Sequence, residues 1–144
     1  MIIHNKSESL SLDIVDYQYP EHRSGEKGYD YDANWLMVAV SYSNDKTSEE
    51  YRDACLLTYE FEDFIKGFSN VLAGKETRYI SEFMEPNLKF SIEIADNKIL
   101  LSMEFCAANE TALKSRKVSE VITKERAIEI VEELRLLFAR FPQR

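Results

Sequence analysis

The feature that most constrains this sequence is an apolar stripe at helical spacing within residues 58–74, TYEFEDFIKGFSNVLAG. The apolar side chains of the stripe recur three or four positions apart, on one face of a helix: Phe61, Phe64, Ile65, Phe68, Val71 and Leu72. Thr58 is predicted to cap this helix, because its hydroxyl can accept from a free backbone N–H of the first turn, and Gly74 is predicted to end it. A second stripe follows Thr123, another predicted N-cap, and ends before Pro142. Both helices need an apolar surface to cover their stripes.

Segments of alternating apolar and polar residues supply that surface, since a period of two is typical of half-buried strands. We predict strands over residues 9–17, 34–43, 54–58, 78–84, 88–95, 98–107 and 116–122. Residues 34–43 are apolar on both faces, which predicts a central strand that is covered on both sides. Runs of strands followed by helices indicate an α+β fold. We expect one curved antiparallel sheet of about six to seven strands with two amphipathic helices packed on it, in the order βββα-ββββα.

The length of 144 residues fits one domain. A chain of this size buries about 68–70% of its unfolded surface, so it needs no metal or disulfide to fold. We expect residues 1–8 to form a mobile N-terminus. Residues 18–33 and 44–53 are predicted to be charged loops, and the first of them is unusually long and acidic.

The two cysteines, Cys55 and Cys106, lie in predicted apolar strands and are expected to be buried thiols in a reducing compartment. No CxxC motif or His/Cys cluster is present, so we expect no metal and no cofactor. The start of the chain is unlike a secretory signal. No apolar run approaches the ~18 residues of a membrane helix. These observations predict a soluble, cytoplasmic protein that does not interact with membranes.

The charge of the chain is concentrated in its first half. The net charge is −8, and residues 1–72 hold 14 acidic and 6 basic residues, whereas residues 73–144 hold 12 of each. Residues 26–63 alone hold ten carboxylates against three basic side chains. Such a field repels nucleic acid and attracts a basic partner. The alternative is that the acidity only keeps the protein soluble.

A catalytic role would have to come from carboxylates, because the two histidines lie in predicted loop or terminal segments and no phosphate-binding loop or nucleophile motif occurs. Asp30 and Asp32 are two residues apart and would project the same way from an extended segment. Glu85 would join them if its turn lay at the same sheet edge. Three convergent carboxylates are typical of a divalent-metal site or of acid–base work on a glycoside. A small carboxylate-dependent hydrolase or metal-binding enzyme is therefore one alternative.

Tyrosines interleaved with carboxylates in the acidic loop favour a contact surface instead, because tyrosine combines a large apolar area with a polar tip. We expect the 18–33 and 43–53 loops to form this surface together. Trp35 is predicted to be packed against the sheet. The predicted partner-binding residues are Glu26, Tyr29, Asp30, Tyr31, Asp32, Asp45, Glu49 and Glu50.

Four segments together resemble the WapI-like immunity proteins, small bacterial proteins paired with wall-associated contact-dependent toxins: YDANWL, CLLTYEFEDF, EFMEPNLKFSI and ILLSMEF. The resemblance runs from about Asp30 to Phe105, with a compatible last strand and helix, and the first 28 residues contribute nothing to it. The family's marked positions correspond here to Asp32, Asn34, Trp35, Leu36, Cys55, Leu57, Thr58, Glu85, Pro86 and Asn87. The resemblance implies a non-catalytic protein that neutralises the C-terminal domain of a toxin, commonly a nuclease.

The sequence therefore predicts an immunity-type protein that binds a basic toxin domain through an acidic surface. Two other functions stay open beside it. One is the carboxylate-dependent enzyme described above. The other is a ligand-binding or scaffold domain, with a homodimer through an exposed strand edge as one possible form.

Overall fold

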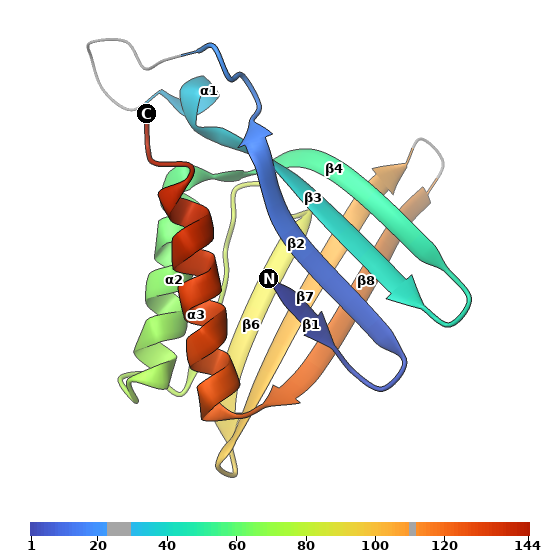
Figure 1. The fold of residues 1–144 in the computed structure, drawn as a ribbon, viewed down its shortest axis with the longest axis vertical. Coiled ribbons are helices and arrows are strands. Elements are labelled where there is room, and N and C mark those ends of the chain that lie inside the picture. Colours follow the sequence, from blue (N-terminus) through green and yellow to red (C-terminus); the bar gives the residue numbers. More distant parts are fainter. Residues whose placement is uncertain (23–29, 110–111) are drawn as a thin grey trace.

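Two four-stranded antiparallel sheets and three helices make up the described part of this computed structural model, which covers residues 1–22, 30–109 and 112–144 (Figure 1). The first sheet has the strand order β1-β2-β3-β4, with bounds Ile2–His4, Glu8–Tyr17, Trp35–Asn44 and Ser48–Leu57. The second has the order β5-β6-β7-β8, with bounds Arg78–Ile80, Leu88–Ala95, Lys98–Asn109 and Ala112–Ile122. The helices are α1, Tyr31–Asn34, α2, Thr58–Leu72, and α3, Lys124–Ala139. The α+β class is confirmed, whereas the single sheet of six to seven strands is wrong.

The division into two sheets follows from the path of the chain after β4. Strand β4 runs into α2 without a loop, and α2 carries the chain away from the first sheet before β5 begins. Each half of the chain ends with a helix that follows four antiparallel strands. Figure 1 shows the two sheets crossing each other, with α2 and α3 side by side along one side of the molecule. Two sheets that cross in this way enclose an apolar interior that a single sheet of the same strands would leave half exposed.

The N-terminal residues 1–8, expected to be mobile, contain strand β1. It pairs with β2, and Ile3 is fully buried. The backbone N–H of His4 donates to Glu120 Oε2 of β8 at 3.0 Å, which ties the first sheet to the second. Three residues are too few to show an alternating pattern, so the sequence did not indicate this strand.

Residues 44–53, predicted as a charged loop, belong mostly to strand β4, and that prediction is wrong. The turn itself is short, and the Oδ1 atom of Asn44 closes it by accepting from the backbone N–H groups of Lys46 and Thr47 at 2.9 and 2.8 Å. Strand β4 is the edge of the first sheet. Edge strands commonly carry charged side chains, which discourage pairing with other chains, and such charges hide the alternation that marks a strand.

The second half of the chain follows its predicted strands more closely. Strand β6 covers residues 88–95 as expected. The hairpin turn after it has positive φ at Asp96 and Asn97, two residue types that tolerate the left-handed conformation. The expected loop between the last two strands is instead largely strand, because β7 and β8 are longer than predicted. The predicted cap of α3 is confirmed, since Thr123 Oγ1 accepts from the backbone N–H of Arg126 at 3.2 Å.

Helix α2 begins differently from the prediction. Thr58 is its first residue and not its cap, and its hydroxyl donates to Asn34 Oδ1 at 2.9 Å. The helix start is held by Glu60, whose Oε2 accepts from the backbone N–H of Leu57 at 2.9 Å. The predicted stop is confirmed, since Gly74 has a φ of 71° just beyond the helix.

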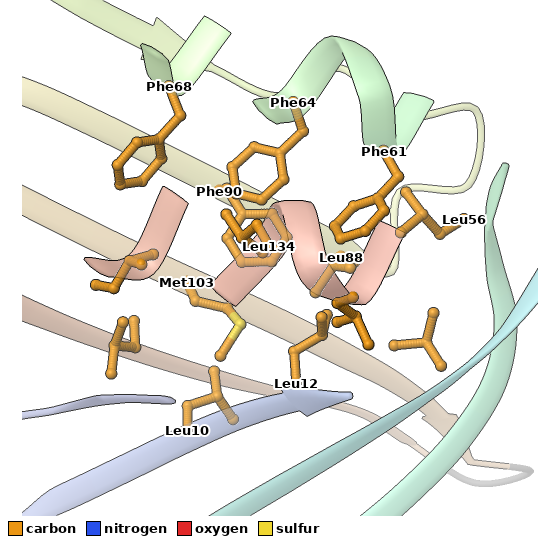
Figure 2. Close-up of a cluster of buried hydrophobic side chains, with 14 of the residues drawn as sticks. Leu10, Leu12, Leu56, Phe61, Phe64, Phe68, Leu88, Phe90, Met103 and Leu134 are labelled. Carbon is orange, nitrogen blue, oxygen red and sulfur yellow. The ribbon is translucent and has the colours of Figure 1, made fainter. Parts of the chain in front are cut away.

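The core lies between the two sheets and the paired helices. Figure 2 shows the three phenylalanines of α2 directed toward side chains of both sheets and of α3. Phe64 is the centre of this cluster, and its ring stacks on Phe90 of β6 with 4.3 Å between centroids. The prediction that both faces of β3 are covered is wrong for the face that points away from the core. Trp35 is half-buried there and Ser41 is exposed, so the outer face of the first sheet is open to solvent.

The cysteines lie in strands as predicted, with Cys55 buried in β4 and Cys106 half-buried in β7, and both are free thiols. Burial is the largest cause that raises the pKa of Cys55 to about 12, followed by the negative charge of nearby carboxylates. No helix within the described ranges has the length and apolar character needed to cross a membrane.

Gly67 of α2 makes close packing against β5 possible. A Cβ atom at this position would lie 2.2 Å from Cε2 of Tyr79, inside the ring's contact distance. We expect Gly67→Ala to lower the free energy of unfolding by about 1–3 kcal/mol through overpacking, although alanine favours a helix by up to ~1 kcal/mol. Urea unfolding monitored by circular dichroism measures the loss. The same change in a Tyr79→Ala background should cause no loss, and a loss of equal size there would contradict the steric explanation.

Candidate partner-binding surface

Asp30 organises the end of the acidic loop by capping helix α1. Its Oδ1 atom accepts from the backbone N–H of Ala33 at 3.3 Å, and its Oδ2 atom lies 2.8 Å from Nε2 of His22. The hydrogen bond from His22 is the largest cause that lowers the pKa of the Asp30 carboxyl below its ordinary value. Asp30 is the extended N-cap and Asp32 lies in the helix, so the two residues do not belong to one extended segment and their predicted parallel projection is wrong. Residues two apart in a helix point in different directions.

Asn34 fixes α1 to the rest of the fold and is fully buried. Its side-chain N–H₂ donates to the backbone carbonyls of Asp30 at 2.7 Å and of Arg144 at 2.9 Å. Its Oδ1 accepts from the backbone N–H of Arg144 at 2.8 Å and from the Thr58 hydroxyl. One amide therefore joins α1, the start of α2 and the C-terminal segment.

The side chain of Arg144 holds the residues before the undescribed part of the loop. Its Nη1 donates to the backbone carbonyls of Pro20 at 3.0 Å and of His22 at 3.1 Å. Its guanidinium carbon lies 3.3 Å from the centroid of the Tyr17 ring, a cation–π contact. The sequence did not indicate this role, because it depends on a contact between residues more than one hundred positions apart.

The exposed residues at this end of the molecule are tyrosines and carboxylates. Tyr19 and Tyr31 are 50% and 49% exposed, and Glu21 and Asp32 are exposed beside them. We call Tyr19, Glu21, Asp30, Tyr31 and Asp32 the α1 surface. The predicted contact residues Glu26 and Tyr29 lie outside the described residues. The α1 surface combines rigid aromatic side chains with negative charge, the combination expected of a site for a basic protein.

The other three predicted contact residues lie at the opposite end of β3. This ten-residue strand spans about 33 Å, so Asp45, in the turn after it, is far from the α1 surface. Glu50 is exposed and accepts from Nε and Nη2 of Arg52 at 3.1 Å. The two predicted loops therefore do not form one continuous patch.

Glu49 has a structural role between the two sheets. Its carboxylate accepts from Nη2 and Nε of Arg116 at 2.9 and 3.0 Å, and the hydroxyl of Tyr51 donates to it at 2.8 Å. The Glu49 side chain is only 13% exposed, and this ion pair raises the pKa of Arg116. Glu49 links β4 of the first sheet to β8 of the second.

The three carboxylates considered for an enzyme come from two separate segments of the chain. Asp30 and Asp32 lie on or beside α1, whereas Glu85 lies in the segment between β5 and β6. Within the described ranges, no group of three or more His, Cys, Asp or Glu side chains is arranged to hold a metal ion. Among the described residues, these carboxylates therefore do not form the divalent-metal site considered for them.

Comparison with known protein families gives a match over nearly the whole chain. The model of the Immunity protein WapI-like family matches residues 1–142, beyond the segment that carries the resemblance in the sequence. No curated protein matches the chain. Similar solved structures include WHY1 from Arabidopsis thaliana, with 9% identity, a TM-score of 0.48 and coverage of 98% of this chain and 88% of that one. WHY3 from Arabidopsis thaliana has 7% identity, a TM-score of 0.45 and coverage of 98% and 86%.

Proposed function

Because this chain belongs to the WapI-like immunity protein family, we propose that it neutralises a cognate toxin domain by binding it, without catalysis. The protein would act in the cytoplasm of the cell that makes the toxin. The toxin domain would be basic, and a nuclease fits best, because a nuclease must present cations to the phosphates of its substrate. An acidic protein surface can occupy that substrate site.

The observation that carries the proposal is the composition and rigidity of the α1 surface. Its carboxylates supply charge complementary to a nuclease, and Tyr19 and Tyr31 supply contact area. The anchor at Asn34 and Arg144 holds this surface in place before a partner arrives. A preorganised surface loses less entropy on binding, and its charge speeds encounter in a salt-dependent way.

Asp45 and Glu50 form a second exposed acidic position at the far end of the first sheet. A partner that contacts the α1 surface would reach them only by extending along β3. We expect them to contribute to long-range attraction more than to the contact itself. Glu49 would support the scaffold of the protein through its ion pair with Arg116.

The test compares two charge-matched double variants for binding to the toxin domain encoded beside this chain. Asp30→Asn with Asp32→Asn removes two charges from the α1 surface and leaves an asparagine that still caps α1. Asp45→Asn with Glu50→Gln removes two charges from the far end. We expect the first variant to weaken binding at least tenfold, which is about 1.4 kcal/mol, and the second to weaken it less. Calorimetry measures both affinities, and unchanged binding by the first variant would contradict the assignment of the α1 surface.

A further inference from the structure

A groove runs between the first turns of α2 and the segment that joins β5 to β6. It has a volume of about 300 Å³. We call it the α2 groove, and its lining residues are Tyr59, Glu60, Asp63, Tyr79, Glu82, Phe83 and Met84. No lysine or arginine is among these lining residues. The sequence did not indicate the groove, because residues 78–84 were predicted as one continuous strand and β5 ends at Ile80.

The walls of the α2 groove are held by buried contacts. Glu60 is buried and joins both walls, since its carboxylate accepts from the backbone N–H of Leu57 at 2.9 Å and of Met84 at 2.5 Å. The rings of Tyr79 and Phe83 pack against Phe64 of the core, with centroids 6.3 and 6.4 Å away. The groove is therefore formed before any ligand arrives.

The groove has aromatic and apolar side chains in its walls beside the buried Glu60, and it is negative at its rim. Met84 is 54% exposed, and Tyr59 and Phe83 are half-buried. Asp63 and Glu82 are exposed at the rim. The pKa of Tyr79 inside the groove is raised to about 12. Burial is the largest cause of this shift, and the negative charges of Asp63 and Glu82 are the next largest.

We propose that the α2 groove binds an arginine side chain of a protein partner. Its apolar stem would lie along Met84 and the aromatic rings, and its guanidinium would meet Asp63 and Glu82. Arginine suits such a site because it combines a long apolar stem with a planar cation that hydrogen-bonds carboxylates and stacks on aromatic faces. The charge at the rim excludes an acidic partner and disfavours an uncharged one.

The α2 groove and the α1 surface lie at the same end of the molecule. Thr58, which hydrogen-bonds Asn34 of α1, is the residue directly before Tyr59. Figure 1 shows the start of α2 near α1. One basic protein can therefore contact both. This inference rests on the proposed function in one respect, since it identifies the partner protein as the toxin domain.

The first experiment uses a peptide and needs no toxin. The chain has four methionines, so methyl-¹³C-methionine labelling gives a simple spectrum in which Met84 reports on the groove. Met103 in the core and Met37 on the outer face of the first sheet serve as references. Titration with acetyl-Gly-Arg-Gly-amide should move the Met84 signal saturably and leave the references in place. The citrulline analogue, which has nearly the same shape without the charge, should move none of them.

Two double variants separate the groove from the overall charge. Asp63→Asn with Glu82→Gln should weaken the peptide's effect on Met84 at least tenfold. Glu129→Gln with Glu132→Gln removes the same number of charges from the exposed side of α3 and should leave that effect unchanged. The assignment of the groove would be overturned if the Met84 signal did not shift with the arginine peptide, or if it shifted equally in both double variants.

The second experiment repeats the titration with the toxin domain encoded beside this chain. The expected result is a shift of the Met84 signal and an affinity at least tenfold weaker for Asp63→Asn with Glu82→Gln than for the α3 control. Binding without a Met84 shift would contradict the groove and leave the proposed function intact. Absence of any binding would contradict the proposed function, and the peptide titration then decides the groove alone.

Discussion

Phe64→Ala is expected to lower the free energy of unfolding by about 3–5 kcal/mol, the largest effect of any single change considered for this fold. Phe64 is fully buried and lies where helix α2 meets the second sheet. Its ring stacks on Phe90 and meets the rings of Phe61 and Phe68 at 6.3 and 6.0 Å between centroids. Alanine would leave a cavity among rigid aromatic neighbours, which cannot move together to fill it.

Chemical denaturation followed by fluorescence or circular dichroism measures this loss. Leu136→Ala is the matched control, because Leu136 is 71% exposed on α3 and its truncation should change stability by less than about 0.5 kcal/mol. If Phe64→Ala cost no more than this control, the aromatic cluster would not be the centre of the core. Phe64→Ala would also remove the support of the α2 groove, because the rings of Tyr79 and Phe83 pack against the ring of Phe64.

Asn34→Ala is expected to cost about 3 kcal/mol, from four lost hydrogen bonds of about 1 kcal/mol each and partial relief by water. The change removes the hydrogen bonds that the amide makes with the hydroxyl of Thr58 and with the backbone groups of Asp30 and Arg144. The α1 surface would lose its anchor. We therefore expect weaker toxin binding together with the loss of stability.

Asn70→Ala provides the same chemical change at a half-buried position of α2 and should alter stability by less than about 1 kcal/mol. A double-mutant cycle with Thr58→Ala measures the coupling, which should exceed about 0.5 kcal/mol for residues in direct contact. Additive effects of Asn34→Ala and Thr58→Ala, or a loss no larger than that of Asn70→Ala, would show that the buried amide does not join these segments.

The two amphipathic helices could be predicted because each signal is local and repeated. The stripe of α2 and the caps or stops at Thr123 and Gly74 depend only on residues within a few positions of one another. Strand β6 was equally clear, since its alternation is uninterrupted. The same reasoning failed where charge hides alternation, as in residues 48–53 of β4, and where a strand is too short, as in β1.

The arrangement of the strands in two sheets could not be predicted from these patterns. Alternation identifies a strand and its apolar face but does not say which strand is its neighbour. The step from one sheet to the other depends on α2 following β4 directly, and a helix packs equally well on one curved sheet or between two. The apolar stripes of both helices do need to be covered, but one curved sheet and two crossing sheets can each cover them.

The candidate contact residues show a similar limit. The charge pattern identified Asp30, Tyr31 and Asp32, which the structure keeps together on or beside α1. It also selected Glu49, which is engaged with Arg116 of β8, a residue 67 positions away. Charge counting along the chain cannot distinguish a carboxylate that faces solvent from one that joins two sheets.

Neutralisation by binding is tested most directly by titrating the toxin domain encoded beside this chain with the purified protein and measuring residual toxin activity. If the chain acts as a stoichiometric inhibitor, activity should fall linearly with the molar ratio and end at a fixed whole-number ratio, and further incubation should not change the end point. The complex recovered by size exclusion should have the same ratio. Full inactivation at a small fraction of that ratio, increasing with time, would show turnover, and unchanged toxin activity at excess protein would show that this toxin is not its partner.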